Sequence, residues 1–331
     1  MPNLKKYHPV DASEVSRFCG IRSFMRLPQV RTHEEVDFAI LGAPADTGST
    51  FRPGQRFAPA AIREMSMMLR AASLTLDINM FEYISGVDWG DVNVSPCDLA
   101  KAHTAIQAEV ANILAGDVIP VCLGGDHSVT LPQLRAVARK HGPVALVHFD
   151  AHLDTYDIEN GDTLTHGTPF YIACQEGHID TAHSIQVGIR GLFNTSARKV
   201  SEDLGFQVIM AEEMRQLGLD EVGRQINARV GNAKTFLTFD IDFVDPAFAP
   251  GTGTIEVGGF TSYEALKLLR QTKDLNYVGM DIVEVLPAFD PTQITAYLGG
   301  AIVHEFLAML ATRRRKQHGN ADTDLLSQSK I

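Results

Sequence analysis

The sequence VALVHFDAHLD, residues 144–154, decides the fold class of this 331-residue chain. Its first half is a short apolar run of the kind expected for a strand that is buried on both faces of a sheet. Its second half places Asp150, His152 and Asp154 directly after that run. Ionisable residues at the end of a buried strand are typical of open parallel sheets, in which ligands bind beyond the carboxyl ends of the strands.

Further apolar runs of the same kind occur along the chain, at residues 36–43, 118–123, 185–189, 207–210, 235–239 and 277–283. Helical patterns separate several of these runs, at residues 98–115, 131–140, 220–229 and 261–273. The last pattern opens with Thr261 and Glu264, a capping-box pair. Alternating strands and helices predict a single α/β domain, with a parallel sheet covered by helices on both faces.

The two ends of the chain depart from this pattern. Residues 1–35 are polar and contain Pro9 and Pro28, so we expect an arm that packs on the surface of the domain, at a subunit contact or elsewhere. The domain itself is expected at residues 36–311. Residues 312–331 are polar and are expected to form a frayed tail, in which the basic run 313–316 is a solvated helix end.

The composition excludes several classes of protein. Hydrophobic residues make up 45% of the chain and charged residues 21%, which is ordinary for a globular protein and argues against disorder. The net charge of −11 disfavours nucleic acid and an anionic membrane surface as partners. No uncharged apolar run approaches the roughly 18 residues that span a bilayer. The first 15 residues lack an apolar signal core and carry Asp11 and Glu14, unlike a transit peptide.

The cysteines predict the compartment. They show no metal-type C-x-x-C spacing, which favours free thiols in a reducing compartment. One of them lies inside an apolar run, where a small buried hydrophobic residue is expected. The four are Cys19, Cys97, Cys122 and Cys174. We therefore expect a cytoplasmic location.

Ionisable side chains follow four of the predicted strands. His127 follows the run 118–123, Asp240 and Asp242 follow the run at 235–239, and Glu284 follows the run at 277–283. Residues two apart on a strand share a face, so Asp150 and His152 can converge, as can Asp240 and Asp242. Asp154 can continue the same side if its segment stays extended.

Such a cluster predicts bound metal. Four carboxylates cannot lie together ionised without cations, because like charges at short range repel strongly. Two divalent ions with a bridging carboxylate remove this repulsion, and the mixture of carboxylate and imidazole ligands suits Mn, and also Fe, Co, Ni or Zn. The absence of cysteine argues against a structural zinc site. Each motif alone is more often a turn cap or a satisfied core histidine, and only their combination favours metal.

The expected chemistry follows from charge. Two divalent ions activate water near neutral pH, and the filled site stays slightly negative, with Glu284 adding a further negative group. A cationic substrate is therefore favoured. A guanidinium group fits, because it is planar and its forked N–H donors match a carboxylate.

At these residues the sequence resembles the ureohydrolase family of arginases, agmatinases and guanidino-acid hydrolases, over roughly residues 15–310. The resemblance is carried by GGDHS, DAHLD and FDIDFVDP, at residues 124–128, 150–154 and 239–246. Shorter matches lie at residues 52–54, 188–190, 249–254 and 283–285. The motif FMRLP, residues 24–28, resembles the agmatinase, guanidinobutyrase and proclavaminate amidinohydrolase branch rather than arginase.

The resemblance implies a three-layer α/β/α arginase-type fold with a mostly parallel eight-stranded sheet, two Mn²⁺ per chain, and a homo-oligomer of three or six copies. It implies that water attacks the guanidinium carbon, releasing urea and an amine, and that Ni²⁺ or another divalent ion is an alternative metal. The implied ligands of one ion are His127, Asp150, Asp154 and Asp240. Those of the other are His152, Asp150, Asp240 and Asp242.

The resemblance also implies roles beyond metal binding. Asp154 would relay a proton from the attacking water, and Glu284 would hold the guanidinium. His166 would shuttle a proton or bind substrate, with a structural surface histidine as the alternative. Asp126 is expected to orient His127, and His148 is expected to pack or to support a ligand without binding metal.

The segment at residues 155–165 is expected to meet the far end of the substrate. It carries Asp157, Glu159 and Asp162 and no Lys or Arg, which favours an ammonium end such as that of agmatine, so Asp157 is a candidate substrate contact. Solvated loop charges are the alternative. A guanidino acid such as guanidinobutyrate would need a cation from Arg190 or from a neighbouring subunit. Ile255 and Leu286 depart from the family pattern and add apolar bulk, which leaves methylated guanidines and biguanides open as substrates.

The complete set of six ligand candidates bears on two other classes of protein. A deacetylase-like enzyme of the same fold with one zinc ion would not need His127 or Asp154. A metal-poor regulatory or partner subunit would be expected to have lost ligands, and all six candidates are present. The sequence therefore favours a binuclear hydrolase, most of all one acting on agmatine to give urea and putrescine.

Overall fold

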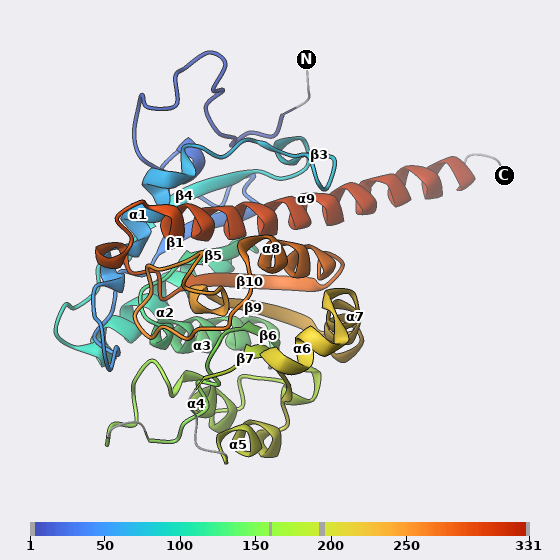
Figure 1. The fold of residues 1–331 in the computed structure, drawn as a ribbon. Coiled ribbons are helices and arrows are strands. Elements are labelled where there is room, and N and C mark those ends of the chain that lie inside the picture. Colours follow the sequence, from blue (N-terminus) through green and yellow to red (C-terminus); the bar gives the residue numbers. More distant parts are fainter. Residues whose placement is uncertain (1–3, 159–160, 192–195, 329–331) are drawn as a thin grey trace.

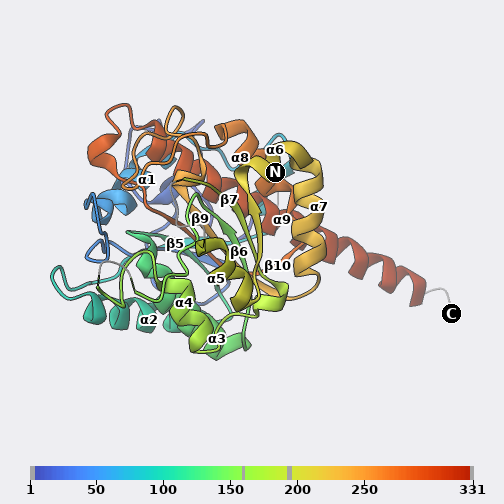
Figure 2. The same ribbon diagram turned by 60° about the horizontal axis from the view of Figure 1, so that its bottom comes forward.

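The computed structural model describes residues 4–158, 161–191 and 196–328, with side chains up to residue 317. An eight-stranded sheet lies between two layers of helices (Figures 1 and 2). Its strands are β1 (Phe38–Gly42), β4 (Gly86–Asp91), β5 (Ile119–Leu123), β6 (Ala145–Phe149), β7 (Ile185–Ile189), β8 (Gln207–Met210), β9 (Lys234–Asp240) and β10 (Asn276–Val283). All of their pairings are parallel. The predicted three-layer α/β/α architecture is confirmed.

The sheet contains one strand that the hydrophobic pattern did not predict. The seven predicted runs form β1 and β5 to β10, whereas β4 reads GVDWGD and has no apolar run. Its Asp88 is buried, and the guanidinium of Arg63 donates to both carboxylate oxygens over 2.8 and 3.0 Å. A buried charge is tolerated when it is paired in this way, so β4 depends on a helix from elsewhere in the chain.

Two layers of helices cover the sheet (Figure 2). One layer contains α2 (Leu99–Ala115), α3 (Thr130–His141), α4 (Pro169–Gln175) and α5 (Ala197–Leu204). The other contains α1 (Ala58–Ser66), α6 (Ala211–Leu217), α7 (Leu219–Val230), α8 (Ser262–Gln271) and α9 (Ile294–Gln328). The four predicted helices correspond to α2, α3, α7 and α8. The predicted capping box of α8 is present, with Thr261 and Glu264 bonding each other's backbone N–H groups.

Helix α9 runs through the boundary expected at residues 311 and 312 and extends past the body of the molecule in Figure 1. Its part Ile294–Gln317 is long and apolar enough to cross a membrane, with a mean hydropathy of 1.5 over its most apolar 18 residues. However, 78% of that window is buried inside the molecule, and core helices of globular proteins meet the same criteria. Arg313 and Arg314 bind Leu275 O and the Asp37 carboxylate, which holds this basic stretch on the domain.

The segment before β1 packs on the domain through a buried arginine. Arg26 donates to the backbone carbonyls of Val10, Val15 and Ser16, and so holds the preceding chain against the surface. Both Met25 and Arg26 have positive φ, of 51° and 59°. Such values are uncommon for residues with a side chain, and they show that the motif FMRLP forms a specific bend.

The strand order places the last two strands in the middle of the sheet. The order is β4-β1-β5-β10-β9-β6-β7-β8, so β9 and β10 lie between β5 and β6. Because all the strands are parallel, the ends of β5, β6, β9 and β10 meet at one edge. Gly125 fits there without a side chain, since a Cβ would overlap the carbonyl oxygen of Ala45.

Candidate metal centre

Buried acidic and imidazole side chains meet at the ends of the four central strands. His127 opens a 3-10 turn after β5, Asp150 directly follows β6, and Asp240 is the last residue of β9. These three residues are at most 2% exposed. The nearby His152, Asp154 and Asp242 come from the segments after β6 and β9. The structure therefore brings together the six residues that the sequence predicted as ligands.

The His127 ring lies at the centre of three carboxylates. Its Nδ1 atom is 3.0 Å from Asp150 Oδ2, 2.9 Å from Asp154 Oδ2 and 3.3 Å from Asp240 Oδ2. Nδ1 nevertheless has no hydrogen-bond geometry to any described residue. The nitrogen and the three oxygens therefore lie close together without a hydrogen bond between them. Ligands around a common metal ion are arranged in the same way.

A second group lies beside the first and shares Asp150. His152 Nδ1 is 2.9 Å from Asp242 Oδ2 and 3.4 Å from Asp150 Oδ1. The candidate ligand atoms of Asp150, His152 and Asp242 lie within 4.8 Å of one another. Asp150 thus offers Oδ2 to the His127 group and Oδ1 to the His152 group, as a bridging carboxylate would.

The convergence arises from tight turns and not from the alternation of side chains on extended strands that we expected. Asp240 Oδ1 accepts a hydrogen bond from Asp242 N over 2.8 Å, and a 3-10 turn begins at Ile241. Asp154 has a φ of 51°, in the left-handed region. The chain therefore bends at Asp240 because the side chain caps the turn that follows it, and it bends at Asp154 through left-handed backbone. Left-handed backbone at a residue with a side chain is often found at functional sites.

The electrostatics of the cluster favour bound cations. Burial raises the pKa of Asp240 well above its usual range, and the neighbouring carboxylates of Asp242 and Asp150 raise it further. Burial lowers the pKa of His127, but Asp150, Asp154 and Asp240 more than offset this and hold it well above its usual range. Positive charge is thus favoured at the point where three carboxylates meet. Hard divalent ions with oxygen and imidazole ligands would satisfy that demand.

A further histidine supports the cluster from behind. His148 Nε2 lies 2.7 Å from Asp150 Oδ2, while Gln186 Nε2 donates to His148 Nδ1 over 2.9 Å. With Nδ1 accepting, the ring proton is on Nε2 and is donated to Asp150. His148 also lies close enough to His127 and Asp150 to be counted among metal-binding groups. Its two hydrogen bonds fit the supporting role that the sequence suggested.

Glu284 lies at the edge of the cluster and is also in the left-handed region, with a φ of 61°. Its Oε1 accepts hydrogen bonds from His127 N and from His166 Nδ1, each over 2.9 Å. Its Oε2 accepts one from Gln55 Nε2 over 2.8 Å. Gln55, on the segment between β1 and α1, was not predicted. The only signal in the sequence was its position next to the family-like motif at residues 52–54.

His166 joins two loops at Glu284. Its Nε2 lies 2.8 Å from Thr50 Oγ1, and its backbone N–H donates to Gly48 O over 3.0 Å. Burial lowers the pKa of His166, whereas Glu284 and more distant carboxylates raise it to about 10. The loop that contains Gly48 and Thr50 is thus held against the loop that contains His166, beside the metal-facing cluster.

Comparison with known proteins identifies the family. The model of the arginase family matches residues 36–309. The chain belongs to the arginase family. It is 42% identical to the mitochondrial agmatinase of Gallus gallus, over 91% of this chain and 89% of that protein. It is 39% identical to the guanidinobutyrase of Pseudomonas aeruginosa, over 92% of this chain and 97% of that one.

The structural comparison agrees. Proclavaminate amidino hydrolase from Streptomyces clavuligerus superposes with a TM-score of 0.87 at 39% identity, covering 90% of this chain and all of that one. These relatives confirm the predicted resemblance to the agmatinase, guanidinobutyrase and proclavaminate amidinohydrolase branch.

In this arginase-family protein, the contacts of Asp126 are with the backbone around His127 and not with the His127 ring. Its Oδ2 accepts from Gly48 N over 2.7 Å, and its Oδ1 accepts from Ser128 N over 3.0 Å. Burial and the charge of Glu284 raise the pKa of Asp126 to about 6. Asp126 therefore caps the turn that begins at His127 and anchors the Gly48 loop, so it acts on the backbone around the site.

The residues expected around the substrate tail lie in different surroundings. Asp157 is exposed, and its carboxylate accepts a hydrogen bond from Ile158 N, whereas Glu159 lies outside the described residues. Leu286 is fully buried against Gly54, and Ile255 is 43% exposed. Arg190, considered as a cation for an acid substrate, is buried and donates to backbone carbonyls, including those of Asp242 and Glu256.

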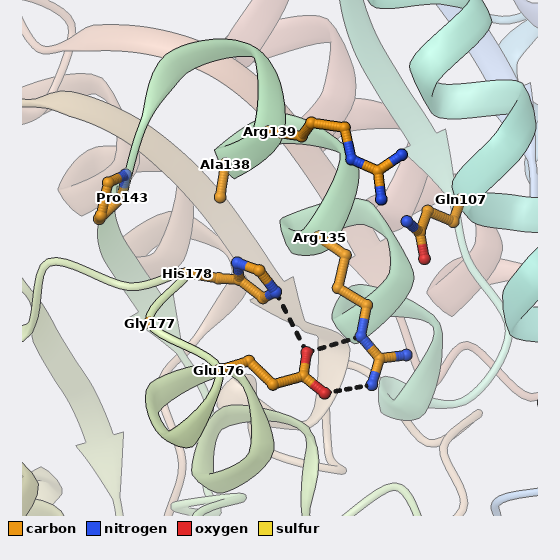
Figure 3. A pocket seen from close by; sticks show the side chains of 8 residues that line it. All are labelled: Gln107, Arg135, Ala138, Arg139, Pro143, Glu176, Gly177 and His178. Carbon is orange, nitrogen blue, oxygen red and sulfur yellow. Dashed lines mark hydrogen bonds and ion pairs between the residues drawn. The ribbon is translucent and has the colours of Figure 1, made fainter.

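A separate cavity of about 510 Å³ opens between α2, α3 and the end of α4 (Figure 3). It shares no residue with the metal-facing cluster. Glu176 binds two of the basic groups that line it, contacting the Arg135 guanidinium over 2.6 and 2.7 Å and His178 Nε2 over 3.1 Å. The one acidic side chain that lines this cavity is thus already paired with two of its basic groups, and the cavity carries no catalytic proposal.

Proposed function

We propose that this arginase-family protein is a ureohydrolase that cleaves agmatine into urea and putrescine with two Mn²⁺ ions. The observation that carries the proposal is the meeting of six ligand-type side chains with one further carboxylate, Glu284, at a single edge of the sheet. Relatives named agmatinase, 42% and 43% identical, support the same activity.

The metal ligands of this proposal follow the two groups of side chains. His127, Asp150, Asp154 and Asp240 would hold one ion, and His152, Asp150, Asp240 and Asp242 the other. Divalent cations held in this way act as Lewis acids and lower the pKa of water. A relative of known structure, the formiminoglutamase of Trypanosoma cruzi, is described with Mn²⁺.

The remaining side chains bind the substrate and move protons. Glu284, whose oxygens already accept N–H donors from Gln55 and His166, is suited to accept the forked N–H groups of a guanidinium. Asp154, beside His127, would take the proton that leaves the attacking water. His166, 2.9 Å from Glu284, would deliver a proton to the departing amine. Asp157, on the exposed loop, would form an ion pair with the ammonium end of agmatine.

Guanidino acids form the second candidate class of substrate, and the guanidinobutyrase relative supports them. Arg190 is buried among backbone carbonyls and cannot reach a substrate carboxylate without breaking those bonds. Arg52 is the better candidate for binding a substrate carboxylate, because it lies near Glu284. Gln55 Nε2 donates both to the backbone carbonyl of Arg52 and to Glu284. The Arg52 guanidinium lies 4.6 Å from the centre of the Phe289 ring, where a cation is stabilised by the ring face.

A urea-release screen tests the proposal. Purified protein would be loaded with Mn²⁺ or Ni²⁺ and offered agmatine, guanidinobutyrate, guanidinopropionate, arginine, guanidine and a biguanide. We expect the highest kcat/KM with agmatine and Mn²⁺. Faster turnover of a guanidino acid would show that the proposed substrate is wrong and that the proposed ureohydrolase reaction is right. Absence of urea from all six would overturn the proposed activity.

The oligomer and the location stay predictions. A trimer or hexamer, implied by the family resemblance, is measured by analytical ultracentrifugation. A cytoplasmic location agrees with the free thiols of Cys19, Cys97, Cys122 and Cys174. Localisation of a tagged chain in its native cells would test it.

A further inference from the structure

The proposed reaction leaves one carboxylate at the site without a task. Asp281 is fully buried in β10, three residues before Glu284. Its Oδ2 accepts hydrogen bonds from Thr130 Oγ1 over 2.7 Å and from Gln133 Nε2 over 2.8 Å. Its Oδ1 has no hydrogen-bond partner among the described residues. A buried carboxylate is costly, so a half-satisfied one calls for an explanation.

A threonine connects this carboxylate to the metal-facing histidine. Thr238 in β9 is the register partner of Asp281 in β10, so the two side chains are neighbours on one face of the sheet. Burial raises the pKa of Asp281, and the charge of His127 and the side chains of Thr238, Thr130 and Gln133 oppose that rise. On its other side, Thr238 Oγ1 lies 2.8 Å from His127 Nε2. Thr238 and His127 are both buried, so no water competes for these contacts.

The protons in this chain of contacts have one consistent arrangement. Asp281 already accepts two hydrogen bonds at Oδ2, as a carboxylate does, and a Thr238 hydroxyl turned towards it would donate to Oδ1, the oxygen without a partner. The oxygen of Thr238 then accepts from His127 Nε2–H. With the ring proton on Nε2, the lone pair of His127 is on Nδ1, the atom that faces Asp150, Asp154 and Asp240.

We propose that Asp281 is a positioning residue that acts through Thr238 to hold the His127 ring and its tautomer, with Nδ1 directed at the carboxylates. This inference rests on the proposed metal binding. It is specific to one of the two groups, because the contacts of His152 with Asp150 and Asp242 do not involve this chain of side chains. The metal ion at the His127 side should therefore depend on Thr238 and Asp281, and the other ion should not.

The test is Mn²⁺ binding by the full-length protein, measured as two dissociation constants by titration calorimetry and equilibrium dialysis. In Thr238→Val, which keeps the shape and removes the hydroxyl, we expect one constant to weaken by roughly 10–100-fold and the other to stay unchanged. Asp281→Asn should weaken the same constant. Thr238→Ser, which restores the hydroxyl, should return it to the wild-type value. In metal-free protein, where the three carboxylates keep the His127 ring protonated, the ¹⁵N and ¹H shifts of Nε2–H should move in Thr238→Val, because that N–H loses its acceptor.

Tyr277→Phe is the matched control. It removes another buried hydrogen bond of β10, from Tyr277 Oη to Thr272 Oγ1 over 2.6 Å, away from the site. It should lower thermal stability and leave both Mn²⁺ constants unchanged. If Thr238→Val and Asp281→Asn bind both ions as the wild type does, or weaken both equally, the inference is wrong. If the wild-type protein itself binds no Mn²⁺, the proposed function fails as well, so the two failures are distinguishable.

Discussion

The candidate site has two halves that are built on different kinds of backbone. The metal-facing half consists of His127, Asp150, His152, Asp154, Asp240 and Asp242, all placed at or just after the ends of β5, β6 and β9. The loop half consists of Gln55, His166 and Asp157, which are placed on the segments at residues 44–57 and 155–168. Glu284 lies where the two halves meet. The sheet holds the first half in place, whereas the second half depends on contacts between loops. Substitutions in the first half are therefore expected to have the larger effects.

The largest effect is expected in the metal-facing half. Asp150→Asn and Asp240→Asn each remove a proposed bridging ligand, which should lower kcat/KM by about a thousandfold or more, because metal ions supply several kcal/mol of transition-state stabilisation. Urea release under saturating Mn²⁺ measures it. Asp203→Asn, which changes an exposed carboxylate of α5 paired with Lys199, should leave turnover unchanged. Near-full turnover in either bridging variant would show that the cluster is not the active site.

A smaller effect is expected where the halves meet. Glu284→Gln keeps the shape of the side chain and removes its charge, so we expect a loss of roughly 30–1,000-fold in kcat/KM, from about 2–4 kcal/mol of lost charge pairing. Mn²⁺ binding should be nearly unchanged, because Glu284 is not a proposed ligand. If this variant lost metal as Asp150→Asn does, the division into two halves would be wrong.

The next effect concerns the pH dependence of stability of the metal-free protein. Glu284 holds the pKa of folded His166 at about 10, against about 6.5 in the unfolded chain. A raised pKa contributes stability that is complete below about pH 6.5 and is lost as pH rises through 10. His166→Asn should therefore reduce the fall in the unfolding free energy between about pH 7 and 10, measured by urea denaturation. Equal slopes in the two proteins would mean that the His166–Glu284 pair does not form.

The smallest effect is expected on the exposed loop. Asp157→Asn should raise KM for agmatine by at most about fivefold and leave kcat unchanged, because an exposed charge pair contributes about 1 kcal/mol or less. Steady-state kinetics with guanidinobutyrate provide the control, since that substrate should bind no worse. If Asp157→Asn lowered kcat/KM as much as Glu284→Gln does, Asp157 would belong with Glu284 and the contrast between the two halves would be wrong.

The two halves also differ in how far the sequence predicts them. The motifs around His127, Asp150 and Asp240 follow apolar runs directly, so strand ends and ligands could be found together. Gln55 has no such signal, because its partner Glu284 is 229 residues away and only the folded chain brings them together. The same holds for Thr238 and Asp281, which look like ordinary strand residues until their register is known.

Strand β4 shows that the fold, like the site, could be predicted from the sequence only in part. Its Asp88 is buried, and its sequence becomes intelligible only when Arg63 of α1 is placed against it. A hydrophobic pattern finds strands that are stabilised by apolar burial, and it misses a strand whose buried charge is paired with a distant side chain. The turns at Asp154 and Asp240 were missed for a related reason, since neither the left-handed backbone of Asp154 nor the capping hydrogen bond of Asp240 is visible in the alternation of residue types.

The order of strands has a consequence for the synthesis of the protein. Strands β4, β1 and β5 form one part of the sheet and β6, β7 and β8 form another, and only β9 and β10 join them. These two strands are the last to leave the ribosome, so the nascent chain exposes two open sheet edges until about 280 residues have emerged. The metal centre lies at that seam. It therefore completes only after β10 has been made, and a product terminated before β10 would be prone to aggregate instead of forming a smaller active enzyme.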